Sequence, residues 1–336
     1  MPLTLVLLGQ SIGKEKLNIY NWSYYIPDSI IDKFEKEYNV KVIYDEFESN
    51  EEMYTRLKTG NNSFDIVFPS QDYASIMINQ GMFGKIDKSL IHNLKNIDPL
   101  VLEKTIYDPA MEFSVPFYWG ATGVIVNTDK VPDYEESWSI FGRSNLKGRM
   151  SMLDDMREVI GASLIYSGYS PNSKNPTEIE AAMNLINNQW KPNLLKFDSE
   201  EFGKNYAIGE LWVVHGYAET VFEEILDNEQ LLKSTIFFIP SEGGIGYVDS
   251  ICILKSARNV HLAHKFIDFI HRPEIYAEFC DNFRYPSAVN IPARKYIERP
   301  AWYQAGDIIN TNLTYNLDNS LELYHNVWFN SIRTGN

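Results

Sequence analysis

Short apolar runs alternate with amphipathic stretches along the first part of the chain. Residues 17–22, 40–44 and 64–68 are runs of strand length, and the last is apolar except for Asp65, as in a strand buried on both faces. Between the first two runs, Pro27 opens a stretch that repeats apolar residues at helical spacing as far as Tyr38. This alternation of strands and helices predicts an α/β fold.

Local signals mark where further helices and strands begin. Asn50 is predicted to cap the next helix, and Gly60 is predicted to end it. Asp154-Asp155 is predicted to open a later helix, and another helix is expected after Gly216. The further predicted strands cover residues 124–127, 150–153, 211–214, 236–239 and 247–250.

Two strand-like segments that contain glycine, residues 120–123 and 243–246, lie where the two halves of the chain meet. They are either two short crossings that form a hinge between lobes or simple turns. From the residues alone, turns are the favoured interpretation.

The length and charge of the chain limit the possible functions. With 336 residues, the chain is long enough for two domains. It carries 45 acidic and 30 basic residues, a formal net charge of -15. This balance disfavours nucleic-acid binding, because phosphate contacts need clustered Lys and Arg. An acidic protein attracts cationic ligands, although acidity alone is too common to identify one.

The cysteines and the N-terminal run give weaker indications. Cys252 and Cys280 lie in apolar contexts and are predicted to be small buried residues, and nothing requires them to pair. No Cys/His grouping has the spacing of a zinc site, so neither a metal nor a cofactor is expected. Residues 2–9 are too short an apolar run to span a membrane and lack a basic region before them. Residues 1–13 are either an export-signal remnant or a first strand.

An ordered set of motifs between residues 17 and 333 resembles the spermidine/putrescine-binding proteins of ABC importers, within the type II periplasmic binding fold. The motifs are Tyr20-Asn21-Trp22-Ser23-Tyr24-Tyr25, Glu48-Ser49-Asn50-Glu51, Pro116-Phe117-Tyr118-Trp119-Gly120-Ala121-Thr122-Gly123, Asp154-Asp155-Met156-Arg157-Glu158-Val159, Glu242-Gly243-Gly244, Asp249-Ser250 and Tyr285-Pro286.

The resemblance implies two α/β lobes joined by two hinge-crossing strands, with a ligand cleft between them. It places residues 14–122 and 249–295 in lobe 1, and residues 126–245 and 302–336 in lobe 2. It also implies a non-enzymatic protein that is periplasmic or attached to a membrane outside the cytoplasm. Such a protein delivers a polyamine, putrescine or spermidine, to an ABC permease in the inner membrane.

Three acids are expected to meet the ammonium groups of such a ligand. Asp249 follows Tyr247-Val248 at an expected crossing between lobes, which would turn it towards the cleft. Asp155 and Glu158 are three apart at a helix start and share a face. From the residues alone both would be structural, since acids favour helix N-termini. The resemblance makes both of them ligand acids and leaves Asp154 as the expected cap.

The resemblance also implies a set of aromatic and hydroxyl residues around the ligand. Aromatic faces would cover the methylene groups, and hydroxyl groups would orient the amines. Trp22, Ser23 and Tyr25 follow a strand at its C-terminal end, where open α/β sheets place ligands. The remaining implied residues are Tyr24, Ser70, Tyr217, Tyr247, where the family usually has Trp, and Tyr285.

Two departures from the family pattern affect the expected site. Tyr24 stands where the spermidine-binding branch has an acid, and Asp72 stands where an aromatic residue is common. One hypothesis is that Asp72 replaces the missing acid; the alternative is a first-turn helix acid. Glu219 could be an extra acid, and the expected polar contact around residues 314–316 is not assigned to one residue. The lost acid favours a shorter diamine or dual specificity.

Three other functions are compatible with parts of the sequence. His261, His264 and His271 could belong to a zinc enzyme, although no catalytic motif accompanies them. A carrier of iron or another small cation would also use Tyr and carboxylate ligands. An adhesion protein is disfavoured because the chain shows no repeats.

Overall fold

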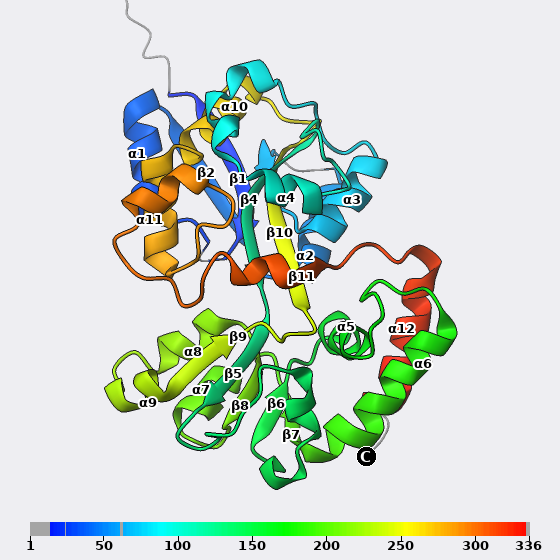
Figure 1. The fold of residues 1–336 in the computed structure, drawn as a ribbon. Coiled ribbons are helices and arrows are strands. Elements are labelled where there is room, and N and C mark those ends of the chain that lie inside the picture. Colours follow the sequence, from blue (N-terminus) through cyan, green and yellow to red (C-terminus); the bar gives the residue numbers. More distant parts are fainter. Residues whose placement is uncertain (1–13, 24, 61–62, 334–336) are drawn as a thin grey trace, which may run out of the picture.

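The computed structural model describes residues 14–23, 25–60 and 63–333, which form two α/β lobes, one above the other in Figure 1. The apolar run 2–9 and Tyr24 lie outside the described residues. The strands are β1 (Lys16–Trp22), β2 (Lys41–Phe47), β3 (Ile66–Val67), β4 (Ser114–Ala121), β5 (Gly123–Asn127), β6 (Met150–Met152), β7 (Leu194–Phe197), β8 (Val213–Gly216), β9 (Thr235–Phe238), β10 (Gly244–Ile253) and β11 (Thr311–Leu313). The helices are α1 (Asp28–Tyr38), α2 (Asn50–Lys58), α3 (Gln71–Asn79), α4 (Pro99–Lys104), α5 (Met156–Tyr166), α6 (Pro176–Leu185), α7 (Phe202–Ala207), α8 (Ala218–Glu224), α9 (Glu229–Ser234), α10 (Val260–Ile270), α11 (Pro273–Phe283) and α12 (Leu321–Trp328).

Each lobe is built on its own sheet. The upper sheet has the strand order β11-β10-β3-β1-β2, and β4 pairs with β10. The lower sheet has the order β7-β6-β8-β5-β9. In the upper lobe, β1 runs parallel to β2 and β3, as expected for strands joined by helices. The predicted two-lobed α/β fold is confirmed.

The glycine-containing segments are crossings between the lobes and not turns. β4 belongs to the upper sheet and β5 to the lower one, with Thr122 alone between them. The second crossing leads from β9 in the lower sheet into β10 in the upper sheet, and Figure 1 shows both connections between the lobes. The two crossings are joined by the amide of Thr122, which donates to the carbonyl of Ile245 at 3.1 Å.

Glycine is required at the first crossing because the backbones are close there. A Cβ atom added to Gly123 would lie 2.6 Å from the carbonyl oxygen of Phe238, which belongs to the neighbouring strand β9. At the start of the second crossing, Gly243 has a φ of 114°, a conformation that other residues rarely adopt.

A third connection runs from β11 to α12. β11 pairs in parallel with the start of β10 in the upper sheet. α12 then packs against α5 and α6 of the lower lobe, where the Tyr324 hydroxyl donates to the carbonyl of Ser173 at 2.8 Å. The segment expected in lobe 2, residues 302–336, therefore also supplies a strand to the upper sheet. The lobe limits stay a prediction.

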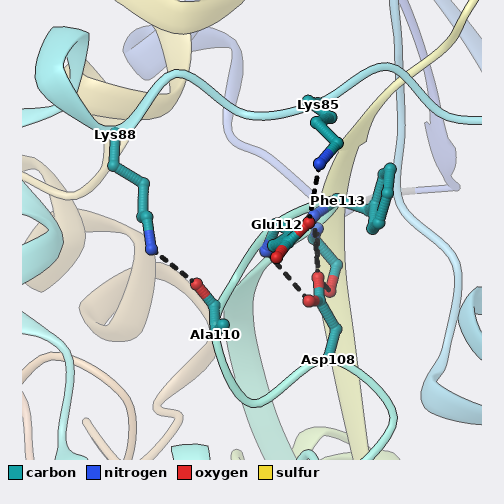
Figure 2. A network of polar contacts seen from close by, with 7 residues as sticks. Lys85, Lys88, Asp108, Ala110, Glu112 and Phe113 are labelled. Atoms are coloured by element: carbon teal, nitrogen blue, oxygen red, sulfur yellow. Dashed lines mark hydrogen bonds and ion pairs between the residues drawn. The ribbon is translucent and has the colours of Figure 1, made fainter.

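The turn before β4 is held by one carboxylate, Asp108, which Figure 2 shows at the centre of a polar network. It accepts hydrogen bonds from the amides of Glu112, Phe113 and Ser114 at 2.8 to 2.9 Å. Lys85 pairs with Glu112 at 3.0 Å on the exposed side. Three amides that would otherwise lack partners are satisfied, so the start of the crossing strand is fixed.

Two predicted helix caps are wrong by one residue. α2 is capped by Ser49, whose hydroxyl accepts from the amide of Glu52, while Asn50 instead accepts from the amide of Ser70 at 3.2 Å. α5 is capped by Asp155 and not by Asp154. In both cases the residue next to the expected one has the extended backbone conformation that a cap needs.

Cys252 and Cys280 are both buried, as predicted, and the question of their pairing, which the sequence left open, is answered by two free thiols. None of the helices within the described part of the chain combines the length and the hydropathy needed to cross a bilayer.

Candidate ligand-binding site

A cavity of about 590 Å³ lies between the lobes and is lined from both of them. Its volume is within the range of small-molecule sites. The upper lobe lines it with the end of β1, the start of α3 and the middle of β10, and the lower lobe lines it with the starts of α5 and α8. The cavity brings together most of the expected ligand residues: Trp22, Ser23, Tyr25, Ser70, Asp72, Asp155, Glu158, Tyr217, Tyr247 and Asp249.

Asp249 lies on the crossing strand β10 and is 3% exposed. It accepts hydrogen bonds from the hydroxyls of Tyr25 and Ser70, both at 2.6 Å. Ser70 is also bridged to Asp249 through the backbone. Burial raises the pKa of Asp249 to about 6, and the two hydroxyl donors partly offset this shift. The carboxylate is thus oriented by neutral donors, with no cation among its described hydrogen-bond partners.

Asp155 caps α5 and Glu158 lies in its first turn, on the opposite lobe. Oδ1 of Asp155 accepts from the amides of Arg157 and Glu158 at 2.7 and 3.1 Å, so Asp155 caps the helix while it lines the cavity. Glu158 is buried and accepts from the hydroxyl of Thr122 at 2.6 Å. Burial raises the pKa of Glu158. The structural and the ligand-binding interpretations of these acids are therefore compatible.

Asp72 lines the same cavity from the first turn of α3. Burial raises its pKa to about 6, opposed by the amide of Tyr73 and the charge of Arg157. Arg157 is held on the lower lobe by the carbonyl of Tyr315 at 3.1 Å and the side chain of Asn172 at 2.8 Å. Asp72 therefore lies at the cavity, as the replacement hypothesis requires. Its carboxylate also accepts a hydrogen bond from the backbone amide of Tyr73 at the start of α3. Its role stays a prediction.

Glu219 is a cavity carboxylate that the expected site includes only as an optional acid. It lies in the first turn of α8 and is partly buried. Burial raises its pKa to about 7, and the charge of Glu223 adds to the shift. No side chain in the described part of the chain donates a hydrogen bond to it. Its helical position resembled an ordinary first-turn acid, so only the tertiary fold reveals its place in the cavity.

The aromatic residues form a row along one side of the cavity. The rings of Tyr217 and Tyr247 lie 6.0 Å apart, and Tyr247 lies 5.9 Å from Tyr118. Tyr285, which was expected in the site, is not among the residues that line the cavity. It stacks on Tyr118 at 4.4 Å and so supports the row from behind. Tyr24 lies outside the described residues.

Some polar lining residues were not among the expected ligand residues, although Glu48 belongs to a motif that carries the family resemblance. They include Glu48, Gln71, Thr220 and Thr314. Gln71 accepts from the amide of Val248 at 2.9 Å and donates to the carbonyl of Thr314 at 3.0 Å. It thereby ties β10 to the C-terminal segment at the position where a polar contact was expected.

Two of the three histidines of the zinc hypothesis, His264 and His271, are engaged elsewhere. His264 accepts from the amide of Asp87 at 2.8 Å, and both ring nitrogens of His271 face backbone carbonyls. Within residues 14–23, 25–60 and 63–333, no three His, Cys, Asp or Glu residues are grouped so as to hold a metal ion.

Comparison with known proteins identifies the family. Residues 29–311 match the bacterial extracellular solute-binding proteins. This chain belongs to that family. It is 38% identical over 283 residues to the spermidine/putrescine-binding periplasmic protein of Escherichia coli, covering 84% of this chain and 79% of the relative.

Two solved structures of the family are closely similar. The TpPotD lipoprotein of Treponema pallidum superposes with a TM-score of 0.90 at 44% identity, covering 94% of this chain and 99% of that one. The spermidine/putrescine transporter substrate-binding protein PotD of Streptococcus pneumoniae superposes with a TM-score of 0.84 at 26% identity, covering 94% and 98%. The resemblance inferred from the motifs is confirmed.

The geometry of this solute-binding protein favours a cationic solute with an apolar middle. Asp249 and Asp72 approach from one lobe, and Asp155, Glu158 and Glu219 approach from the other. The tyrosine row offers flat apolar faces between them. Carboxylates that are buried without paired cations are costly, and a ligand with several positive charges would relieve that cost.

Replacing Glu219 by Gln should stabilise the ligand-free protein at high pH. The folded state raises the pKa of this carboxyl from the ordinary 4.5 to about 7, so it binds its proton more tightly than the unfolded chain does. Its contribution to stability is full below pH 4.5 and is lost as the pH rises through about 7. We expect Glu219→Gln to raise the free energy of unfolding by about 1–3 kcal/mol at pH 8, less at lower pH.

Urea unfolding between pH 5 and 8 measures this difference. Glu224→Gln, an exposed change on the same helix, is the control and should leave stability unaltered. Equal stability of Glu219→Gln and the parent protein at pH 8 would show that this carboxylate is well solvated.

Proposed function

We propose that this protein captures putrescine or spermidine outside the cytoplasm and delivers it to an ABC permease in the inner membrane. The observation that carries the proposal is the convergence of carboxylates from both lobes on one cavity beside a row of tyrosine rings. The relatives support it, because the E. coli protein is named for spermidine and putrescine binding.

Both ends of a polyamine have a complementary surface in the cavity. An ammonium group can pair with Asp249, which Tyr25 and Ser70 hold in place. A second ammonium can pair with Glu158 or with the free oxygen of Asp155 on the opposite lobe. The methylene groups between them lie against Tyr217 and Tyr247. A diamine carries a positive charge at each end of a methylene chain. Acids on both lobes with tyrosine rings between them complement such a molecule.

The expected contacts are strong enough for specific binding. A hydrogen bond to a charged group contributes about 1.5–3 kcal/mol, and a cation over an aromatic ring about 0.5–2 kcal/mol. Two such charged contacts with ring burial approach the roughly 8 kcal/mol of a micromolar complex. Binding therefore needs no chemical change in the ligand.

Ligand binding would close the lobes. A ligand that contacts both lobes at once binds the closed form better than the open form and shifts the population towards it. The two crossings at Thr122 and Ile245 are the places where the lobes can move about one another. The closed pair of lobe surfaces would then dock on the permease.

A carrier for another small cation is the second candidate. Tyrosines and carboxylates also bind metal ions, and both are present in the cavity. The spread of the acids along the aromatic row favours an extended organic cation over a compact ion.

Calorimetric titration with putrescine, spermidine and spermine tests the proposal. We expect micromolar or tighter binding of putrescine or spermidine, and a loss of about 10- to 100-fold in affinity for Asp249→Asn. Asp227→Asn, which removes an exposed charge away from the cavity, is the matched control. No heat with any polyamine, together with a response to Fe³⁺ or another metal ion, would favour the second candidate.

The variant Asp72→Asn decides the role of Asp72. If Asp72 supplies the acid that is missing at position 24, the variant should bind spermidine or putrescine about tenfold more weakly. Thermal unfolding checks that the variant is folded. We expect it to be, because the side-chain oxygen of the introduced Asn can still accept a hydrogen bond from the backbone amide of Tyr73. Unchanged affinity for both ligands would remove Asp72 from the site and leave it as a first-turn helix acid.

A further inference from the structure

Glu158 is attached directly to the hinge. Its Oε2 accepts a hydrogen bond of 2.6 Å from the hydroxyl of Thr122, the one residue between β4 and β5. The amide of the same threonine donates to Ile245 on β10. A single residue therefore links a cavity carboxylate to both crossing strands. α5, which carries Glu158, also packs tightly on β10, because a Cβ atom at Gly161 would lie 2.8 Å from Ile245.

His215 faces the same carboxylate oxygen from the other side. It is fully buried on β8, and its Nε2 lies 3.5 Å from Oε2 of Glu158. Neither ring nitrogen has a hydrogen-bond partner among the described residues. At 3.5 Å from Glu158 the imidazole is too far for a good hydrogen bond, and a buried imidazole that is poorly satisfied is costly.

His215 is also connected to the second crossing. The rings of His215 and Trp138 form a T-shaped pair, with their centroids 5.1 Å apart and an interplanar angle of 86°. The indole nitrogen of Trp138 donates to the carbonyl of Gly243 at 2.8 Å, immediately before β10. Glu158 is thus connected to both crossings. Thr122 links it to the first, and His215 and Trp138 link it to the second.

We infer that Thr122 and His215 are positioning residues that fasten the ligand carboxylate of Glu158 to the hinge and favour its charged form. The inference rests on the proposed function, because it assigns a role to residues that do not touch the ligand. An ammonium group that pairs with Glu158 binds a carboxylate that is hydrogen-bonded to Thr122, in the first crossing. The lobes would rotate about the two crossings, so the ligand contact lies next to the hinge. Ligand capture and lobe closure would then be coupled through this hydrogen bond.

The groups around Glu158 set the pH at which it becomes charged. Burial raises its pKa, His215 and the Thr122 hydroxyl lower it, and Asp155 raises it further. The other titratable or charged groups that face this region are Arg157 on α5, Tyr217 after β8, Glu219 on α8, Tyr247 and Asp249 on β10, and Asp72 on α3. Without the Thr122 hydroxyl or His215, Glu158 would hold its proton to higher pH and lose its attraction for an ammonium group.

The test compares Thr122→Val, Thr122→Ser and His215→Gln by titration with putrescine and spermidine between about pH 5.5 and 8.5. We expect Thr122→Val to weaken binding three- to tenfold near neutral pH and to move the midpoint of the pH profile upward. Thr122→Ser keeps the hydroxyl and should restore both properties. His215→Gln should move the midpoint in the same direction.

Thr235→Val is the matched control, because it removes a buried hydroxyl from β9 in the same lobe, where it bonds Leu231 and Tyr206. It should leave affinity and pH profile unchanged. If the parent protein binds a polyamine and Thr122→Val keeps both its affinity and its pH midpoint, the inference is wrong. Weaker binding with an unmoved midpoint would also overturn it, since a purely structural role predicts that result. If the parent protein binds neither polyamine, the proposed function itself fails.

Discussion

Buried negative charge that exceeds the nearby positive charge is the constraint on which the rest of the structure depends. Asp249 and Glu158 are almost fully buried, and the side chains that donate to them at 2.6 Å are neutral hydroxyls. Burial raises the pKa of these groups and of Glu219, so the charged forms of these acids are disfavoured in the cavity. Such a site gains most from a ligand that brings positive charges to both lobes at once.

The architecture keeps these acids apart in sequence and close in space. Asp249 is carried by a strand that crosses between lobes, and Glu158 is bonded to the residue of the other crossing. Glycine at Gly123 allows the close approach of β9, and Asp108 fixes the turn that leads into β4. The hinge is therefore part of the binding site, which explains how a small ligand can influence the arrangement of two large lobes.

The strands and helices of the first lobe could be predicted because their hydrophobic periodicity is regular, as in β1, α1 and β2. The caps at Ser49 and Asp155 could not, since neighbouring residues have equally suitable side chains and the backbone conformation decides between them. In the cavity, Asp249 and Glu158 were predicted from motifs. Tyr285 was also predicted from its motif, but it stacks on Tyr118 and is not among the residues that line the cavity, so its contact with a ligand stays a prediction.

A crystal structure of the protein grown with putrescine or spermidine tests the central claim most directly. The account predicts one ligand nitrogen within hydrogen-bond distance of Asp249 and another within that distance of Glu158 or Asp155, with the methylene groups against Tyr217 and Tyr247. A ligand that contacts the acids of one lobe only, or that binds outside the cavity, would contradict it.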